Sequence, residues 1–374
     1  MKTTKLMLIG LALASASIAI VPSPSNAQLT VQQLVKEAQR EGRLDVTLAG
    51  TDEKGVKKIG AAFQERFGLK IAFNGDVSMG SDTLVRDKAI AETKAGIAPT
   101  FDVIRGEARY PLESVYGGAL ERISDWEPLL KELDAEAYKV RKKISYGPVE
   151  GYAFEWGARI GAILYNPKLI SRDEVPRTWK EIGNPKYKGK FSVPPWITVT
   201  LLGLMKYDKN EWLEIVRTWG RNKADILTYA SGIERLLLGD LAFLDANDYY
   251  YFSEKAKDAN APIELSYFED LTMYRPVFFA LRKGARHPNA AKLFTLWAAT
   301  GHAINAFETT TYYPNMVYGK GPISKQVTDT WTKRNIKPTS PYDSAKILDT
   351  LAWLDTKEGN EYQKAITLAQ RDGK

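Results

Sequence analysis

Cysteine is absent from the 374-residue sequence, and histidine occurs only twice, as His287 and His302. Without cysteine we expect no disulfide bond, no thiolate metal site and no lipid-modified cysteine anchor. Neither histidine has a neighbouring serine or acidic motif typical of a catalytic triad. The sequence also lacks the spacings of a P-loop, a dinucleotide fingerprint, a zinc-protease helix and an EF-hand. These absences indicate a protein that is not an enzyme.

A long uncharged apolar run is found only near the N-terminus, over residues 6–20, after two lysines. A stretch of proline and small residues follows it and ends at Ala27. This order is typical of a secretory signal, and the run is shorter than a membrane-spanning helix. Residues 1–27 are therefore predicted to be a signal peptide cleaved near Ala27 and Gln28. A secreted chain without a lipid-bearing cysteine is expected to diffuse freely in the periplasm.

The composition indicates a well-packed globular protein with more than one core. Hydrophobic residues make up 44% of the sequence and aromatic residues 11%, which argues against disorder. A chain of 374 residues exceeds what one core usually supports, so two lobes are expected. The formal net charge is +7, with basic and acidic residues interspersed. No basic helix or aromatic-rich strand pair suggests nucleic-acid binding, whereas a mild attraction for an anionic solute fits the charge.

Hydrophobic periodicity predicts that strands alternate with helices in the first part of the mature chain. Such alternation predicts an α/β fold with a mostly parallel sheet and right-handed crossovers. In sheets of this kind ligands bind beyond the carboxyl ends of the strands. The loops after Leu48 and Ile104 are therefore candidate binding loops. The expected helices cover residues 29–42, 56–67 and 82–94, and the expected strands cover residues 45–48, 69–73 and 101–104.

The segment from Arg159 to Pro194 carries the most specific pattern in the chain. It contains a strand run ended by an Asn-Pro pair, a capping-box pair (Thr178 and Glu181) and a Lys-Gly-Lys turn before a new strand. This order of elements resembles the middle of the periplasmic solute-binding proteins of ABC importers, where it marks the entry of the chain into the second lobe. A later segment, over residues 282–299, resembles a lobe-one helix of the same family, with Phe294 and Trp297 on its buried face.

The resemblance implies a fold. The expected architecture is the two-lobe type II fold of periplasmic binding proteins, in which each lobe is a mostly parallel sheet flanked by helices and a hinge joins the lobes. The expected hinge crossings lie near residues 152–159 and 273–280. Lobe one is expected to comprise residues 28–155 and 275–315, and lobe two residues 156–274 and 316–374.

Three adjacent tyrosines, Tyr249 to Tyr251, follow an apolar run. In a strand, Tyr249 and Tyr251 point to one side and Tyr250 to the other, which is compatible with plain packing. The segment also resembles a stretch that supplies two phenolate ligands from lobe two in the ferric-ion-binding members of the family. The resemblance assigns these ligand positions to Tyr249 and Tyr250, and gives Asn247 a role in holding the accompanying anion. Phenolate is a hard oxygen donor that suits ferric iron.

Two loops of lobe one hold further candidates. Glu107 lies in the loop after the expected strand over residues 101–104, at the position of the glutamate that completes the iron shell in the ferric-binding proteins. Arg105 is suited to satisfy Glu107 or to grip a carboxylate or phosphate of a solute. Asp52 stands where the ferric-binding pattern has a histidine nearby, and it is also suited to cap the helix that follows.

The loop from Pro194 to Thr198 departs from the ferric-binding pattern. That pattern has small hydroxyl residues or another tyrosine here, whereas this chain has Trp196 and Thr198. Trp196 suits an aromatic wall against which a flat organic solute packs. Core packing is the more frequent role of such a residue.

The sequence therefore predicts a substrate-binding protein of an ABC importer. The favoured ligand is ferric iron, as transported cargo and not as a cofactor, held by Glu107, Tyr249 and Tyr250. The alternative is a small organic or phosphorylated anion bound through Arg105, Arg159 and aromatic residues, and a periplasmic enzyme is the remote alternative. The expected partners are an ABC permease and its ATPase in the inner membrane, with no nucleic acid, and the chain is expected to be a monomer.

Overall fold

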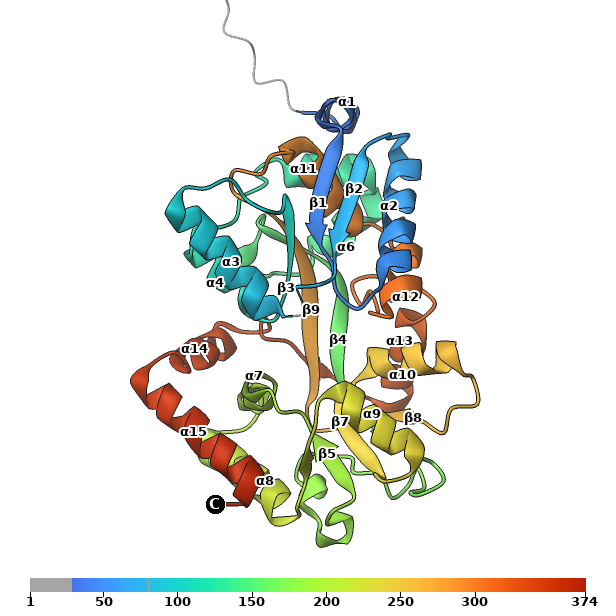
Figure 1. The fold of residues 1–374 in the computed structure, drawn as a ribbon, viewed down its shortest axis with the longest axis vertical. Helices are drawn as coiled ribbons and strands as arrows, with labels where there is room; N and C mark the ends of the chain where they lie inside the picture. Colours follow the sequence, from blue (N-terminus) through green and yellow to red (C-terminus); the bar gives the residue numbers. More distant parts are fainter. Residues whose placement is uncertain (1–28, 80) are drawn as a thin grey trace, which may run out of the picture.

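The computed structural model describes residues 29–79 and 81–374. The predicted signal peptide, residues 1–27, lies outside these described residues. Within them, no helix is both long enough and apolar enough to cross a bilayer. Figure 1 shows an upper half around the first three strands and a lower half around β5 and β7, with two long strands, β4 and β9, running from one half to the other.

One mixed sheet extends through both halves, in the order β2-β1-β3-β9-β4-β7-β5-β6. In the upper half β1 pairs in parallel with β2 and β3, and in the lower half β5 pairs in parallel with β6 and β7. The long strands β4 and β9 pair antiparallel with each other and with their neighbours β7 and β3. The parallel arrangement expected within each lobe is present, and the antiparallel pairs arise where the chain crosses between halves. The strands are β1 (Arg43–Thr47), β2 (Ala72–Asp76), β3 (Val103–Glu107), β4 (Ala153–Tyr165), β5 (Phe191–Val193), β6 (Asp225–Ile226), β7 (Phe243–Asn247), β8 (Glu264–Ser266), β9 (Thr272–Leu281) and β10 (Pro338–Thr339).

Helices cover the sheet and begin where the sequence provides caps. The Thr30 side chain forms a capping box with Gln33 at the start of α1, and Gly42 ends this helix with a φ of 68°. The long helices are α1 (Val31–Glu41), α2 (Glu53–Phe67), α3 (Asp82–Ala95), α8 (Lys209–Arg221), α9 (Tyr229–Leu238), α10 (Asp248–Lys257), α11 (Pro288–Ala298), α13 (Ser324–Arg334) and α15 (Lys357–Asp372). The shorter ones are α4 (Tyr110–Tyr116), α5 (Trp126–Leu133), α6 (Ala135–Arg141), α7 (Ile197–Thr200), α12 (Ile304–Thr311) and α14 (Ala345–Trp353), with the 3₁₀ turns η1 (Gly147–Val149), η2 (Glu181–Gly183), η3 (Pro185–Tyr187) and η4 (Leu201–Met205).

Three boundaries differ from the sequence-based expectation. The strand expected over residues 69–73 begins only at Ala72, because its pairing with β1 starts there, opposite Arg43, while Leu69 and Ile71 pack into the upper core before the strand. The strand expected over residues 101–104 continues to Glu107, which pairs with Val277 of β9, so Glu107 does not lie in a loop. The expectation that Tyr249 to Tyr251 lie in a strand is wrong. Strand β7 ends at Asn247, and the three tyrosines lie in the first turns of α10.

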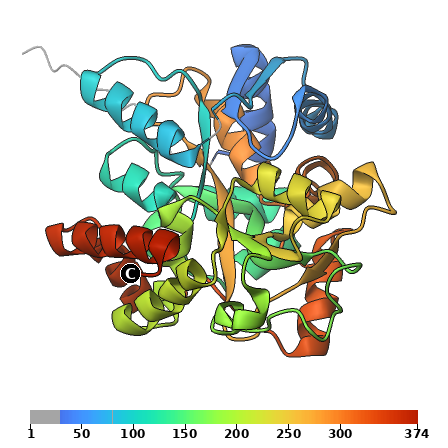
Figure 2. The same cartoon turned by 60° about the horizontal axis from the view of Figure 1, so that its bottom comes forward.

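Each half has its own hydrophobic core. Helix α11 crosses the upper core, where Phe294 and Trp297 are buried as expected. The lower core contains three clustered tryptophans, Trp179, Trp212 and Trp219. Helix α15 packs along α8 beside this core (Figures 1 and 2). The two cores leave the middle of β4 and β9 as the place where the halves meet.

Candidate functional site

A cleft of about 850 Å³ opens where the two halves meet. The upper half contributes the loop after β1, the starts of α2 and α3, the end of β3 and the end of α12. The lower half contributes the first turn of α9, one side of α10 from Tyr249 to Lys257, and the segment from Trp196 into α7. The long strands β4 and β9 form its floor through Arg159 and Arg275. A cleft lined from both halves fits a solute that is enclosed between them.

The sheet register brings three charged residues together on this floor. Arg159 of β4 and Arg275 of β9 are directly paired across the two strands. Directly opposed residues of neighbouring strands present their side chains on the same face of the sheet. Glu107 ends β3, the other neighbour of β9, and its carboxylate lies between the two guanidinium groups.

Glu107 forms ion pairs with both arginines. Its Oε1 atom lies 3.1 Å from Arg159 Nη1 and 3.2 Å from Arg275 Nη1. Burial alone would raise the pKa of Glu107, but the charges of Arg159, Arg275 and Arg105 outweigh burial and lower this pKa below its usual value. Arg275 also donates to the Asn247 side chain. The carboxylate of Glu107 is therefore held ionised as the shared counterion of two cations.

Arg105 has a structural role that the sequence did not predict. Its Nε donates to the Leu48 carbonyl at 3.1 Å and its Nη2 to the Met79 carbonyl at 2.7 Å, and Nη1 forms an ion pair with Asp82. The side chain is almost fully buried, although it lines the cleft. The grip on a solute expected of Arg105 is weakened, because most of its donors already hold the loops around the cleft.

Arg159 is the more accessible arginine of the pair, with 19% of its side chain exposed against 5% for Arg275. Its Nε donates to the Tyr313 hydroxyl at 3.0 Å. Tyr313 approaches so closely to Gly50, whose φ is 68°, that a Cβ there would lie 2.7 Å from the ring. Among the described residues, no acceptor is bonded to Arg159 Nη2. Because Arg159 lines the cleft, Nη2 is the donor of this side chain that remains for a solute.

Aromatic rings form a continuous wall along one side of the cleft. Ring centroids are 4.8 Å apart for Trp196 and Tyr229, and 5.2 Å apart for Tyr229 and Tyr250. The wall continues to Tyr249, 4.1 Å from Tyr250, and on to Tyr313, 4.7 Å from Tyr249. Burial raises the pKa of Tyr249 and of Tyr313 above the usual value for a phenol. These hydroxyls therefore favour the neutral form over phenolate.

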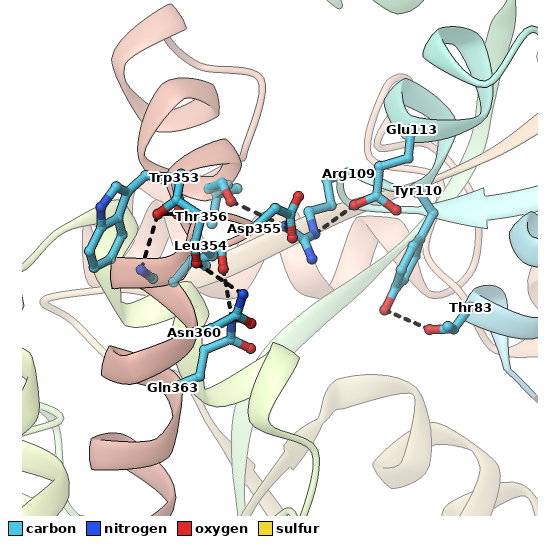
Figure 3. Close-up of polar contacts among 12 residues, drawn as sticks. Thr83, Arg109, Tyr110, Glu113, Trp353, Leu354, Asp355, Thr356, Asn360 and Gln363 are labelled. Atoms are coloured by element: carbon cyan, nitrogen blue, oxygen red, sulfur yellow. Dashed lines mark hydrogen bonds and ion pairs between the residues drawn. The ribbon is translucent and has the colours of Figure 1, made fainter.

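The C-terminal segment also connects the two halves, through residues outside the cleft lining. Figure 3 shows Arg109, beside α4, turned toward Asp355, which follows α14. Arg109 Nη1 lies 3.1 Å from the Leu351 carbonyl and 3.2 Å from Asp355 Oδ1. The Tyr342 hydroxyl donates to the Ala108 carbonyl at 2.6 Å. The segment after β10 thus contacts the upper half, while α15 packs on the lower half.

The charged residues around the cleft are mostly cationic. Three carboxylates line it: Asp52, Asp82 and Glu107. Six cations line it: Lys54, Lys58, Arg105, Arg159, Lys257 and Arg275. Burial raises the pKa of Asp82, despite the opposing charge of Arg105. The cleft is therefore a positive site, which attracts anions.

The structure places seven of the nine predicted site residues at the cleft wall: Asp52, Arg105, Glu107, Arg159, Trp196, Tyr249 and Tyr250. Asp52 also caps α2, accepting from the Gly55 amide at 2.8 Å. Asn247 lies behind the wall and contacts Arg275, and the side chain of Thr198 is outside what the structure describes. Sequence reasoning missed Arg275, Tyr313 and Asp82. The sequence did contain a signal for Arg275, which is the single charged residue in the apolar run of β9. A charge in such a run indicates a buried partner or a ligand, because charges are rarely buried alone.

Three buried carboxyl groups outside the Arg159–Arg275 pair predict how stability depends on pH. Burial raises the pKa of Glu155 and of Asp245 to about 7, and the pKa of Asp248 to about 8. The native state therefore binds more protons than the unfolded chain between their ordinary and raised values, and stability falls as pH rises through this range. The pKa of Glu107 is lowered, so its protonation affects stability only at pH values below this range.

We expect the free energy of unfolding to fall by on the order of 3 kcal/mol or more between about pH 5 and about pH 8. Urea unfolding at both pH values measures this difference. Asp248→Asn removes one of the three titrating groups and should reduce the difference. A free energy that stays constant or rises over this range would contradict the assignment of raised pKa values.

Comparison with known proteins agrees with this fold. The family described as bacterial extracellular solute-binding protein matches residues 58–333. Iron-bound HitA from Pseudomonas aeruginosa is 15% identical with a TM-score of 0.59, over 87% of this chain and 99% of that chain. AfuA from Actinobacillus pleuropneumoniae, with fructose 6-phosphate bound, is 16% identical with a TM-score of 0.62, over 84% and 98%. A putative spermidine/putrescine ABC transporter from Listeria monocytogenes is 13% identical with a TM-score of 0.58, over 87% and 99%.

Similarity at these identities establishes the fold and not the ligand, and the ligands named for these three proteins differ in charge and size. No curated protein matches the chain in sequence. The family match extends over well over half of the 374 residues. The chain therefore belongs to the bacterial extracellular solute-binding protein family.

Proposed function

We propose that the chain is a periplasmic protein that captures a small carboxylate- or phosphate-bearing solute in the cleft and delivers it to an ABC permease. The observation that carries this proposal is the arginine pair on the cleft floor, where Arg159 and Arg275 share the single carboxylate of Glu107. Arginine keeps its charge at every physiological pH. Arg105, Arg159 and Arg275 together face two carboxylates, Glu107 and Asp82, and Asp82 lies 3.9 Å from Arg159 Nη1, so net positive charge remains where a solute meets the sheet.

Recognition of the anionic group would centre on Arg159. Its free Nη2 atom can donate to a carboxylate or phosphate oxygen, and guanidinium groups bind both anions with strong, directional hydrogen bonds. Lys54 and Lys58, on the first turns of α2, add positive charge at the upper rim. The aromatic wall from Trp196 to Tyr313 would pack against the apolar or ring part of the solute.

Capture requires that the solute contacts both halves. The division into lobe one (28–155 and 275–315) and lobe two (156–274 and 316–374) is part of this proposal, with the hinge in β4 and β9. A solute held by Arg159 and the tyrosine wall on one side and by the α2 start on the other would favour the closed form. The closed form would then dock on the permease, whose ATPase drives import.

Ferric iron is the second candidate. It is supported by one observation, that Tyr249, Tyr250, Glu107 and Asp52 line the same cleft and offer hard oxygen donors. Two features place it second. The Glu107 carboxylate is already paired with two guanidinium groups, and the raised pKa of Tyr249 opposes the phenolate that iron needs.

Titration calorimetry of the mature chain tests the proposal. We expect fructose 6-phosphate or citrate to bind. Neutral fructose should bind about a hundredfold more weakly or not at all, because it has no anionic group that can form ion pairs with Arg159 and Arg275. Higher salt should weaken anion binding. Equal affinity for fructose and its phosphate, or no binding of either anion alongside coloured ferric binding, would rule the proposal out.

A further inference from the structure

A second cavity, of about 280 Å³, lies on the opposite face of the sheet from the cleft. Neighbouring residues of a strand point to opposite faces, so Tyr274 lines this back cavity while Arg275 faces the cleft. A register shift in β4 between Glu155 and Gly157 turns Glu155 toward Tyr274, although Arg159 faces the cleft. The back cavity is therefore separate from the site described above.

Glu155 is a buried carboxyl group in the wall of this cavity, with 3% of its surface exposed. It accepts hydrogen bonds from the hydroxyls of Tyr146 and Tyr274. Among the described residues that line the cavity there is no lysine or arginine, and none forms an ion pair with Glu155. The charge of Arg141 acts to lower the pKa of Glu155, but Arg141 lies 4.3 Å over the Tyr146 ring and pairs with Glu150 at 2.7 Å. Burial without a cation of its own raises the pKa of Glu155 to about 7, so a positively charged guest in this cavity would stabilise the ionised carboxylate.

Aromatic faces make up much of the remaining wall. Tyr146 and Tyr342 lie with ring centroids 5.7 Å apart, and Tyr274 and Trp331 also line the cavity. A second acid, Asp343, belongs to the same lining. Aromatic rings grouped around a carboxylate attract organic cations through cation–π interactions. The indole N–H of Trp331 is buried and has no acceptor among the described residues. A guest that carries an oxygen beside its cationic group would supply that acceptor.

We propose that the back cavity binds a small organic cation with an oxygen acceptor, of the amino-alcohol class. Glu155 neutralises the cationic group, the rings of Tyr146, Tyr274 and Tyr342 pack around it, and the Trp331 N–H donates to the oxygen. This site is independent of the cleft solute, so its test does not depend on the function proposed above.

Choline and 3,3-dimethyl-1-butanol form a matched pair of probes, because they share shape and hydroxyl and differ in charge. Titration calorimetry of the mature chain should show saturable 1:1 binding of choline and at least about tenfold weaker binding of the alcohol. Glu155→Gln keeps an acceptor oxygen for one of the two tyrosine hydroxyls, places an amide NH₂ beside the other and removes the charge, and it should weaken choline binding by about tenfold or more. Glu361→Gln, an exposed acid of α15, is the charge-matched control and should leave choline affinity unchanged.

Trp331→Phe provides a second variant in case Glu155→Gln does not fold, as judged by circular dichroism. This variant keeps an aromatic ring and removes the N–H donor, so it should weaken choline binding by about threefold or more. A crystal soaked with choline should show the guest behind β4 and β9. Absence of saturable choline binding, equal binding of the neutral alcohol, or an unchanged affinity in folded variants would overturn the proposal.

Discussion

Arg159→Gln is expected to weaken the binding of fructose 6-phosphate or citrate in the cleft by about a hundredfold or more. Glutamine removes the charge and the Nη2 donor that has no acceptor among the described residues. It also leaves Glu107 with Arg275 as its remaining partner within 4 Å among the described residues. The carboxylate would then oppose the incoming anion more strongly. Loss of attraction and gain of repulsion act in the same direction, which is why this effect should be among the largest.

Titration calorimetry with the same anions measures the change. Arg159→Lys keeps the charge but not the planar group, so its affinity should lie between those of wild type and Arg159→Gln. Arg122→Gln is a matched control, because Arg122 is exposed and does not line the cleft. An Arg159→Gln variant that is folded and binds either anion as tightly as wild type would refute the role given to the arginine pair.

Local patterns in the sequence predicted the elements that carry their own signals. Capping residues and helical periodicity located α1, α2 and α3 to within a few residues, and the residues around Arg159 to Pro194 indicated the family. The loops after β1 and around the end of β3 were correctly placed at the cleft, because ligands in α/β sheets bind beyond the carboxyl ends of parallel strands.

Several cleft residues are positioned by contacts between segments far apart in the chain, and the sequence alone did not predict these contacts. Glu107 belongs to a strand because β9, far away in the chain, pairs with it. Arg275 stands opposite Arg159 only through the register of two strands that more than a hundred residues separate. Tyr313 joins the cleft because the chain after α12 passes close to Gly50. None of these contacts leaves a periodic or motif signal near the residue itself.

The tyrosine triplet shows how local geometry changes an interpretation. On a helix, Tyr249 and Tyr250 both reach the cleft, whereas a strand would have separated them. Tyr251 turns away and packs against apolar clusters of the lower half. The pair expected from the ferric-binding resemblance is therefore at the cleft, but its neighbours are guanidinium groups.

Replacement of Glu107 distinguishes the anion from iron by the sign of the effect. Glu107→Gln is similar in size and removes the one carboxylate shared by Arg159 and Arg275. With the counterion gone, the floor of the cleft becomes more positive, and anion affinity should increase by about tenfold or more. If the cleft holds ferric iron, the same change removes a metal ligand, and iron binding should be lost.

The most direct measurement is the dissociation constant of fructose 6-phosphate and of citrate for wild type and Glu107→Gln, measured side by side with ferric binding by absorbance. Glu361→Gln serves as the control for loss of one negative charge outside the cleft. The arginine-pair account predicts that at least one of the two anions binds more tightly to the folded Glu107→Gln variant. Weaker anion binding in that variant, or coloured ferric binding by wild type that Glu107→Gln abolishes, would contradict it.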